Sequence, residues 1–157
     1  MSVRVRPLAE EDRGWVREVV ERLWGSPVVA AHGEILEPAT LPGFVAEEGS
    51  ARAGLLTYRP EGDACEVVTI VAFEPRRGIG SALMGALLSL DHRRVWLTTT
   101  NDNVPARRFY ERLGFRLVAM REGEVARSRE LKPEIPLVGV GGVPIRDELE
   151  YELVRPA

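Results

Sequence analysis

Residues 74–88 read EPRRGIGSALMGALL and place two arginines, two glycines and a serine directly before an apolar helical repeat. The first backbone N–H groups of a helix have no intrahelical acceptor and lie at the positive end of the helix dipole, so an anion binds there readily. The glycines let a ligand approach the backbone without a Cβ in the way, the serine adds a hydroxyl donor, and a guanidinium suits phosphate oxygens. The predicted anion-binding residues are Arg76, Arg77, Gly78, Ile79, Gly80 and Ser81.

The class of anion is narrowed by residues that the turn does not contain. A Walker loop requires Gly-Lys-Ser or Gly-Lys-Thr, and the only lysine of the chain is Lys132, far from this turn. A dinucleotide fingerprint requires Gly or Ala where the chain has Leu83, although Asp102 lies about twenty residues further on, as the ribose-binding acid of nicotinamide folds does. A nicotinamide coenzyme, another phosphate-bearing ligand and a plain tight turn with solvated arginines all remain open.

The composition argues against metal, membrane and nucleic-acid chemistry. The 157 residues suit one domain, 1–157, and the net charge of -3 gives no general attraction to nucleic acid or anionic membranes. Cys65 is the single cysteine, and with only two histidines the chain has too few soft ligands for a zinc site. The N-terminus, MSVRVRPLAEEDR, is too charged for a signal peptide. We therefore expect a cytoplasmic protein with no metal, no nucleic-acid partner and no membrane partner.

Hydrophobic periodicity predicts an α/β chain. The expected strands are residues 2–7, 44–48, 53–58, 64–73, 95–100, 115–121 and 149–154, and the expected helices are residues 10–24, 81–90 and 103–113. Residues 64–73 are rich in β-branched side chains and almost continuously apolar, which is typical of a central strand covered on both faces. Trp15 and Trp24 fall on the apolar face of the first helix and are predicted core residues. In residues 26–42 the pattern is weak, and we expect a short second helix interrupted by Gly33.

A second motif follows the strand at residues 95–100. The pattern N-x-x-A-x-x-x-Y-x-x-x-G-F at residues 103–115, together with R-G-I-G at residues 77–80 ahead of a helix, resembles the GNAT family of acetyl-CoA-dependent N-acetyltransferases. The resemblance implies a GNAT fold, an α/β (α+β) chain with a mixed, mostly antiparallel sheet of about seven strands, about four helices and a splayed parallel strand pair at the cofactor site. One departure is Pro75, where the family pattern has Gln or Arg.

The resemblance also implies that acetyl-CoA, and hence coenzyme A, is the cofactor. Its pyrophosphate would lie on the backbone of residues 77–81, and its pantetheine arm would enter the gap between two splayed strands. There its amides would pair with free N–H and C=O groups at Ala72 and Phe73, as an added β-strand does. Asn103 and Ala106 complete the predicted cofactor-binding set, although Asn103 also suits the N-cap of the following helix.

Two residues are predicted to be catalytic. Tyr110 matches the family position whose hydroxyl points at the cofactor sulfur, and a phenol can protonate a departing thiolate. Glu66 is the only acidic residue of the central strand and is the candidate base for the amine; it shares a strand face with Val68 and Ile70, so we expect apolar surroundings. The alternatives are a core position for Tyr110 and an exposed strand-end carboxylate for Glu66. Cys65 has no histidine beside it in the strand, so an acyl-enzyme is not expected.

The acceptor side is less determined by the sequence. Residues 123–147 form a long connection between the last two strands, in the place where a GNAT fold would cover the acceptor. Its candidate ligands are Arg127, Arg129 and Lys132 for a carboxylate, and Asp147 and Glu148 for an amine. Both kinds of acceptor remain open, and the same segment is alternatively a solvated flap or a homodimer contact.

The leading hypothesis is an N-acetyltransferase that moves an acetyl group from acetyl-CoA to a primary amine of a small molecule or peptide. The transfer would be a direct attack in a ternary complex. Two alternatives belong to other classes: a non-catalytic acyl-CoA-binding regulatory module, and an NAD(P)-binding oxidoreductase.

Overall fold

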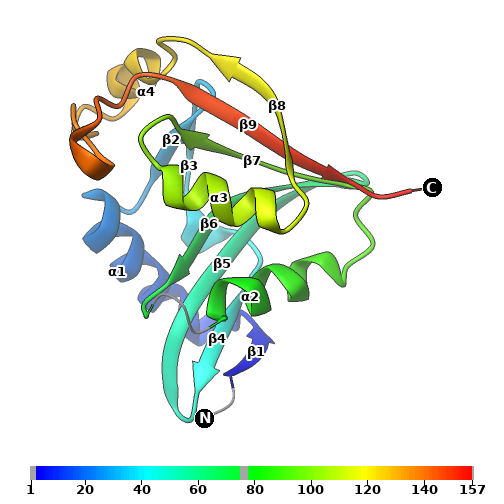
Figure 1. The fold of residues 1–157 in the computed structure, drawn as a ribbon. Coiled ribbons are helices and arrows are strands. Elements are labelled where there is room, and N and C mark those ends of the chain that lie inside the picture. Colours follow the sequence, from blue (N-terminus) through cyan, green and yellow to red (C-terminus); the bar gives the residue numbers. More distant parts are fainter. Residues whose placement is uncertain (1–2, 75–77, 157) are drawn as a thin grey trace.

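The structure is a computed structural model that describes residues 3–74 and 78–156. Its main sheet has seven strands. In spatial order they are β1 (Val3–Pro7), β4 (Gly43–Glu48), β5 (Ala51–Glu61), β6 (Ala64–Ala72), β7 (Arg94–Thr100), β9 (Glu148–Val154) and β8 (Arg116–Arg121). Neighbouring strands are antiparallel, except that β6 and β7 are parallel. The predicted mixed, mostly antiparallel sheet is confirmed (Figure 1).

Helices cover both faces of this sheet. Those of the described residues are α1 (Arg13–Trp24), α2 (Ile79–Leu88), α3 (Val104–Arg112) and α4 (Val125–Leu131). Successive side chains of a strand point to opposite faces, so adjacent residues of β5 identify the two layers. Leu55 packs with Val19 of α1, whereas Leu56 belongs to the cluster that holds Leu83 of α2 and Tyr110 of α3. Thus α1 lies on one face, and α2 and α3 lie on the other (Figure 1).

None of the helices in residues 3–74 and 78–156 combines the length and the apolar character needed to cross a bilayer.

Residues 26–42 do not form the predicted interrupted α-helix. They form a small antiparallel hairpin of β2 (Val29–Ala31) and β3 (Glu34–Leu36), followed by the short 3₁₀ helix η2 (Pro38–Thr40). His32 and Gly33 make the turn with φ values of 40° and 80°. Two successive positive values are typical of the type I′ hairpin turn. The helical expectation failed because strands of three residues are too short to show alternation.

The two tryptophans of α1 have different surroundings. Trp15 packs against the cluster around Val16 and lies edge-on to Phe73, with 6.0 Å between ring centroids. Trp24 is 38% exposed, so the core prediction is wrong for this residue. It lies beyond Val20, the last buried residue of α1, and lines the cavity described below.

A buried carboxylate joins β1, β5 and the short 3₁₀ helix η1 (Glu10–Asp12). Asp12 is fully buried and accepts hydrogen bonds from Arg6 at 2.7 and 3.0 Å, from Arg52 at 3.0 Å and from the Ala9 N–H at 2.8 Å. The hydrogen bonds from Arg6 are the main reason that the pKa of Asp12 lies well below its ordinary value. This cluster fixes the start of α1 against the sheet.

Replacing Asp12 by alanine should lower the free energy of unfolding by about 2–4 kcal/mol, because Arg6 and Arg52 lose their buried partner. The folded-state pKa of Asp12 is lowered, so this stabilisation is complete above the pKa of an unfolded aspartate and is lost as pH falls toward the folded value. The difference between the two proteins therefore narrows in acid, and urea unfolding at about pH 7 and about pH 3 measures it. Glu10→Ala is the control, because Glu10 is exposed and its one ion pair within the described part of the chain is with Arg13, at 3.5 Å. Equal losses in both variants would contradict this account.

Candidate functional site

The strands β6 and β7 begin side by side and then separate. Their parallel ladder starts at Ala64 and Arg94 and ends at Glu66 and Trp96. Beyond that point β6 stays paired with β5, and β7 stays paired with β9. Figure 1 shows the two strands diverging from their common end. The splayed parallel pair predicted from the resemblance is confirmed.

The inner edge of β6 presents backbone groups to this gap. Phe73 donates its N–H to the carbonyl of Ala53 at 3.0 Å, in the ladder with β5. Alternate residues of an antiparallel strand direct their backbone groups to opposite sides, so Ala72 and Ile70 face the gap. The prediction of a free N–H is therefore consistent with the β5–β6 ladder at Ala72. At Phe73 the prediction of a free N–H is wrong, because this N–H binds the Ala53 carbonyl. Contact of the cofactor with other atoms of Phe73 stays a prediction.

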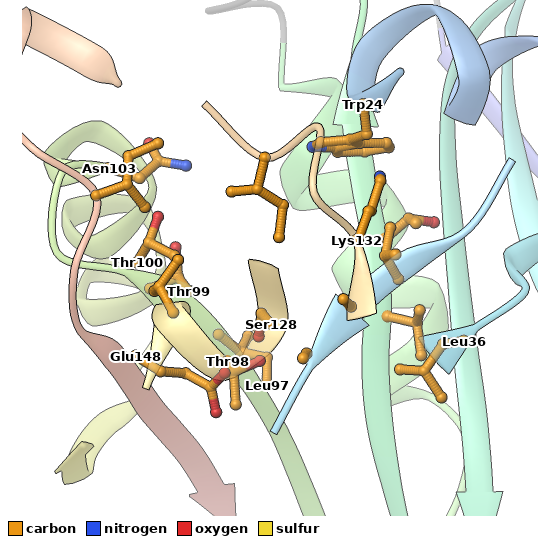
Figure 2. A pocket seen from close by; sticks show the side chains of 18 of the residues that line it. Trp24, Leu36, Leu97, Thr98, Thr99, Thr100, Asn103, Ser128, Lys132 and Glu148 are labelled. Carbon is orange, nitrogen blue, oxygen red and sulfur yellow. The ribbon is translucent and has the colours of Figure 1, made fainter. Parts of the chain in front are cut away.

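A cavity of about 630 Å³ opens where the two strands separate. Residues 67–70 of β6 and 97–100 of β7 form part of its wall, and α3 contributes Tyr110. The hairpin of β2 and β3, the end of α1, and α4 line the other sides. Figure 2 shows Thr100 across the cavity from Lys132.

The N-terminus of α2 has backbone N–H groups without an acceptor among the described residues. Gly78 is the N-cap, with φ of 73°, and no side chain of the described residues caps this end. Ala82 donates the first intrahelical N–H, to the Gly78 carbonyl at 2.9 Å, so the N–H groups of the three residues between them have no intrahelical acceptor. A Cβ on Gly78 would meet no atom of the described residues within 4 Å. The geometry supports the anion-site prediction; the predicted ligands Arg76 and Arg77 lie outside the described residues.

The three residues after Gly78 have different side-chain surroundings. The Ile79 side chain is buried in the core, and Ser81 is exposed. A Cβ on Gly80 would lie 3.1 Å from Cζ of Phe109, so this glycine lets α2 approach α3. Ile79 and Gly80 therefore have only backbone groups to offer an anion, and binding at all three positions stays a prediction.

Tyr110 belongs both to the core and to the cavity wall. It is 8% exposed, and its ring packs against Phe109, Phe115 and Tyr151 at centroid distances of 5.5, 6.0 and 6.1 Å. Burial raises its pKa to about 12. A core position and a place at the cavity are therefore compatible for Tyr110, because its ring packs in the core and the residue also lines the cavity.

Glu66 is buried and lines the cavity, but its surroundings are charged. One carboxylate oxygen lies 2.7 Å from Nε2 of His32, and the other accepts a hydrogen bond from Arg59 at 3.0 Å. Both of these partners also contact Glu34. Arg59 donates to it at 2.9 Å, and Nδ1 of His32 lies 3.1 Å from its carboxylate. The expected apolar surroundings and the exposed alternative are both wrong, because β5 and the β2–β3 hairpin bring polar side chains over this end of β6.

His32 is a site residue that no sequence pattern identified. Its backbone N–H donates to Glu148 at 2.9 Å, and its ring centroid lies 5.4 Å from that of Trp96. The hydrogen bond to Glu66 raises the pKa of His32 against the opposing effect of burial, and the charges of Glu148 and Glu34 add to the rise. Its only sequence signal was a histidine before a glycine, which does not identify a partner 34 residues away.

Asn103 and Ala106 meet at the start of α3. The side chain of Asn103 accepts the Ala106 N–H at 3.4 Å, so the capping alternative is confirmed. Asn103 also lines the cavity, and Ala106 packs beside the core. Cofactor binding by these two residues stays a prediction.

Residues 123–147 are not structureless. They begin with α4 and continue into a segment, residues 133–147, that we call the flap; it contains the short helix η3 (Val140–Gly142) and a bridge between Val138 and Pro144. Residues of the flap line the cavity together with α4. The segment therefore forms part of the cavity wall, and its role as a cover for the acceptor stays a prediction.

Two polar residues at the end of β7 hold the flap. Asn101 donates to the Pro144 carbonyl at 2.9 Å and accepts the N–H groups of residues 146 and 147 at 2.9 and 3.0 Å. Asp102 is 5% exposed and accepts the N–H of Val140 at 3.0 Å. A Cβ on Gly139 would overlap the Asp102 carboxylate, so only glycine allows this approach.

The candidate acceptor ligands divide into two groups. Arg127 pairs with a glutamate one turn earlier in the chain, Arg129 donates to carbonyls of the flap, and Asp147 accepts a backbone N–H. Lys132 and Glu148 line the cavity. Of the five candidates, these two lie in the cavity wall, and acceptor binding by them stays a prediction.

Comparison with known proteins shows which family has this geometry. A sequence profile described as "Acetyltransferase (GNAT) family" matches residues 8–115. The chain belongs to the GNAT acetyltransferase family. The uncharacterized protein YxbD of Bacillus subtilis is 33% identical over 152 residues, which cover 94% of this chain and 96% of that protein.

Two solved structures have the fold of this GNAT protein. A Bacillus subtilis acetyltransferase in complex with CoA superposes with a TM-score of 0.69 and 16% identity, covering 99% of this chain and 100% of that one. The ribosomal-protein-S18-alanine N-acetyltransferase from Escherichia coli superposes with a TM-score of 0.70 and 16% identity, covering 99% and 96%. The predicted GNAT fold is confirmed.

The matched part of this GNAT protein ends before the flap. It contains β6, α2, β7 and α3, and hence the gap and Tyr110, but not residues 123–147. The family profile therefore does not describe the acceptor side. Membership of this family disfavours the nicotinamide hypothesis. Asp102 was its candidate ribose-binding acid, and its carboxylate accepts hydrogen bonds from the Thr100 hydroxyl and the Val140 N–H.

Replacing Asp102 by alanine should loosen the flap of this GNAT protein, because the Val140 N–H loses its acceptor. We expect hydrogen exchange of flap peptides that contain Val140 to accelerate about tenfold, which corresponds to about 1.4 kcal/mol of local opening free energy. Exchange in α1 should stay unchanged. The matched control is Asp91→Ala, at an exposed position. Unaltered exchange at Val140 would show that Asp102 does not hold the flap.

Proposed function

We propose that this GNAT protein is an N-acetyltransferase that moves an acetyl group from acetyl-CoA to a primary amine of a small molecule or peptide, by direct attack in a ternary complex. The supporting observation is the cavity between the separated ends of β6 and β7, which is lined by the free edge of β6 and by Tyr110. The CoA complex of the Bacillus subtilis relative and the N-acetyltransferase activity in the name of the Escherichia coli relative support the same class of reaction.

The described residues fit coenzyme A at two places. The uncapped N–H groups after Gly78 suit its pyrophosphate, and the backbone of Ile70 and Ala72 suits the amides of its pantetheine arm. Asn103 and Ala106, at the start of α3, complete the proposed contact surface. When bound, acetyl-CoA supplies an acetyl group activated as a thioester.

Tyr110 is the proposed proton donor. Its raised pKa of about 12 keeps the proton on Oη at neutral pH. Three aromatic rings hold it in place, so the donor needs no rearrangement to act. We infer that Tyr110 gives this proton to the thiolate as it leaves and is then reprotonated from solvent.

Direct attack is supported by the state of the only thiol. Cys65 is fully buried in β6, and burial raises its pKa to about 11. A thiol with this pKa is protonated at neutral pH and is a poor nucleophile. The chain thus offers no cysteine for an acyl-enzyme.

The proton of the attacking amine has a route to solvent through three side chains. Oε2 of Glu66 lies 2.7 Å from Nε2 of His32, and Nδ1 of His32 lies 3.1 Å from Oε2 of Glu34. The side chain of Glu66 is 2% exposed and that of Glu34 is 50% exposed, so the route runs from the cavity to water. Arg59 holds both carboxylates, at 3.0 and 2.9 Å. We infer that Glu66 accepts the proton and that His32 passes it outward.

The Tyr110→Phe variant tests the proposed reaction. It should lower kcat for acetyl transfer about 100-fold, because a positioned general acid contributes on this scale. Release of CoA thiol in the presence of an amine panel measures the rate, and stabilisation by acetyl-CoA in a thermal-shift assay should persist in the variant. Tyr58→Phe, on β5 outside the cavity wall, is the control. An unchanged rate in Tyr110→Phe removes Tyr110 from the mechanism, and binding without thiol release by the wild type favours a regulatory acyl-CoA module.

The proton route predicts a pH dependence. His32 accepts a proton only when its imidazole is neutral, so kcat/KM should rise with pH through a midpoint above the ordinary histidine value of 6.5. Deprotonation of the acceptor amine also raises kcat/KM with pH, so the profile is measured with two amines of different pKa. The limb, meaning the rising part of the profile, whose midpoint is the same for both amines belongs to the protein. His32→Gln should remove that limb and lower the rate about tenfold, whereas His92→Gln should not. The proton route is wrong if the limb persists in His32→Gln.

A further inference from the structure

Lys132 is the only lysine of a chain with twenty arginines, and it is buried against the cavity. Lys132 is 4% exposed. Lys132, Val125 and Ser128 all line the cavity. The spacing of three and four residues puts these three side chains on one face of α4 and its C-cap. One face of this short helix therefore supplies two polar groups to the acceptor side of the cavity.

The ammonium group of Lys132 has little compensation for its burial. It donates one hydrogen bond, to the Val28 carbonyl at 2.7 Å. Among the described residues no carboxylate lies within ion-pairing distance, and Glu134 acts on it only through its more distant charge. An ammonium has three donors, so two remain for a ligand. Burial of a charge is costly unless it is paired, which makes a bound anion the expected partner.

Ser128 provides a second free donor. It is 3% exposed, lies one helical turn before Lys132 and lines the same cavity. Its hydroxyl makes no hydrogen bond to residues 3–74 and 78–156, and it is not one of their fully buried unpartnered atoms. The hydroxyl is therefore accessible and can donate a hydrogen bond to a ligand in the cavity. Figure 2 shows both side chains on the cavity wall.

The cavity carries the opposite charge elsewhere on its wall. Glu66 and Glu148 are buried carboxylates that line it, and both contact His32. We infer that the acceptor is an amine that also carries a carboxylate, with the carboxylate held by Lys132 and Ser128 and the amine directed toward the gap between β6 and β7. This inference rests on the proposed acetyl transfer and specifies its substrate class.

A carboxylate fits this site better than a phosphate does. One ammonium neutralises one negative charge, and a phosphate dianion would leave a second charge buried without a partner. Phosphate recognition favours the planar guanidinium, yet Arg127 and Arg129, the arginines of this helix, are directed to other partners. The one cation of α4 that lines the cavity is thus a point charge suited to a monoanion.

The experiment compares matched pairs of acceptors. Glycine, β-alanine, 4-aminobutyrate and 5-aminopentanoate are each assayed beside their carboxamides by thiol release from acetyl-CoA. In the wild-type protein at least one carboxylate should exceed its amide about tenfold in kcat/KM, and the preferred chain length reports the spacing between Lys132 and the attacking amine. In Lys132→Gln this ratio should fall to about one through KM, while KM for acetyl-CoA stays unchanged. Gln retains a donor for the Val28 carbonyl, which preserves the local contact.

Two further variants control the result. Arg127→Gln makes the same change of charge on the same helix, at a side chain that is 64% exposed and paired with Glu124, and should leave the ratio unaltered. Ser128→Ala should reduce the ratio in part, and it tests the site independently if Lys132→Gln fails to fold.

A ratio near one for every pair in the wild-type protein overturns the inference, and so does an unchanged ratio in Lys132→Gln. Acetyl transfer to amines without any preference for carboxylates leaves the proposed function intact and removes only this inference. Absence of transfer to every amine overturns both.

Discussion

Backbone N–H and C=O groups in proteins are rarely left without partners, yet β6 and β7 stop pairing after Glu66 and Trp96. Each strand stays attached on its outer side, to β5 and to β9, so the two halves of the sheet hold the inner edges apart. The register of β6 against β5 also shifts by one residue at Val68, and such a bulge bends its strand. The cavity, the free edge and the position of Tyr110 all depend on this interrupted ladder.

The charges around the cavity are arranged by elements that are distant in the sequence. Glu66 on β6 is held by His32 from the β2–β3 turn and by Arg59 from β5. Lys132 approaches from the end of α4 and is held by a backbone carbonyl. Carboxylates and one ammonium therefore line different parts of one cavity, as the inferred zwitterionic acceptor requires. The same separation explains why no single stretch of sequence shows the site.

The flap is attached by polar contacts more than by apolar packing. Asn101 and Asp102 bind its backbone, and Arg129 donates to the Pro136 and Ile145 carbonyls at 2.7 and 2.8 Å. Its apolar side chains are largely outside the core, and Leu137 is 72% exposed. Segments with few buried apolar contacts open at lower free energy than packed helices. The flap is thus a less stable part of the molecule than the strands of the main sheet.

Local patterns were sufficient for the main sheet and for α1, α2 and α3, because alternation and helical period depend only on neighbours in the chain. They failed for the β2–β3 hairpin, whose strands are too short to show a period. By itself the sequence determined the strands of the main sheet, the glycine turn before α2 and the spacing that places Tyr110 on α3. Only the tertiary structure decided that His32 meets Glu66, and that Lys132 lines the cavity in preference to Arg127. These contacts depend on how separate elements pack against one another, and that packing leaves no periodic signal in the order of residues.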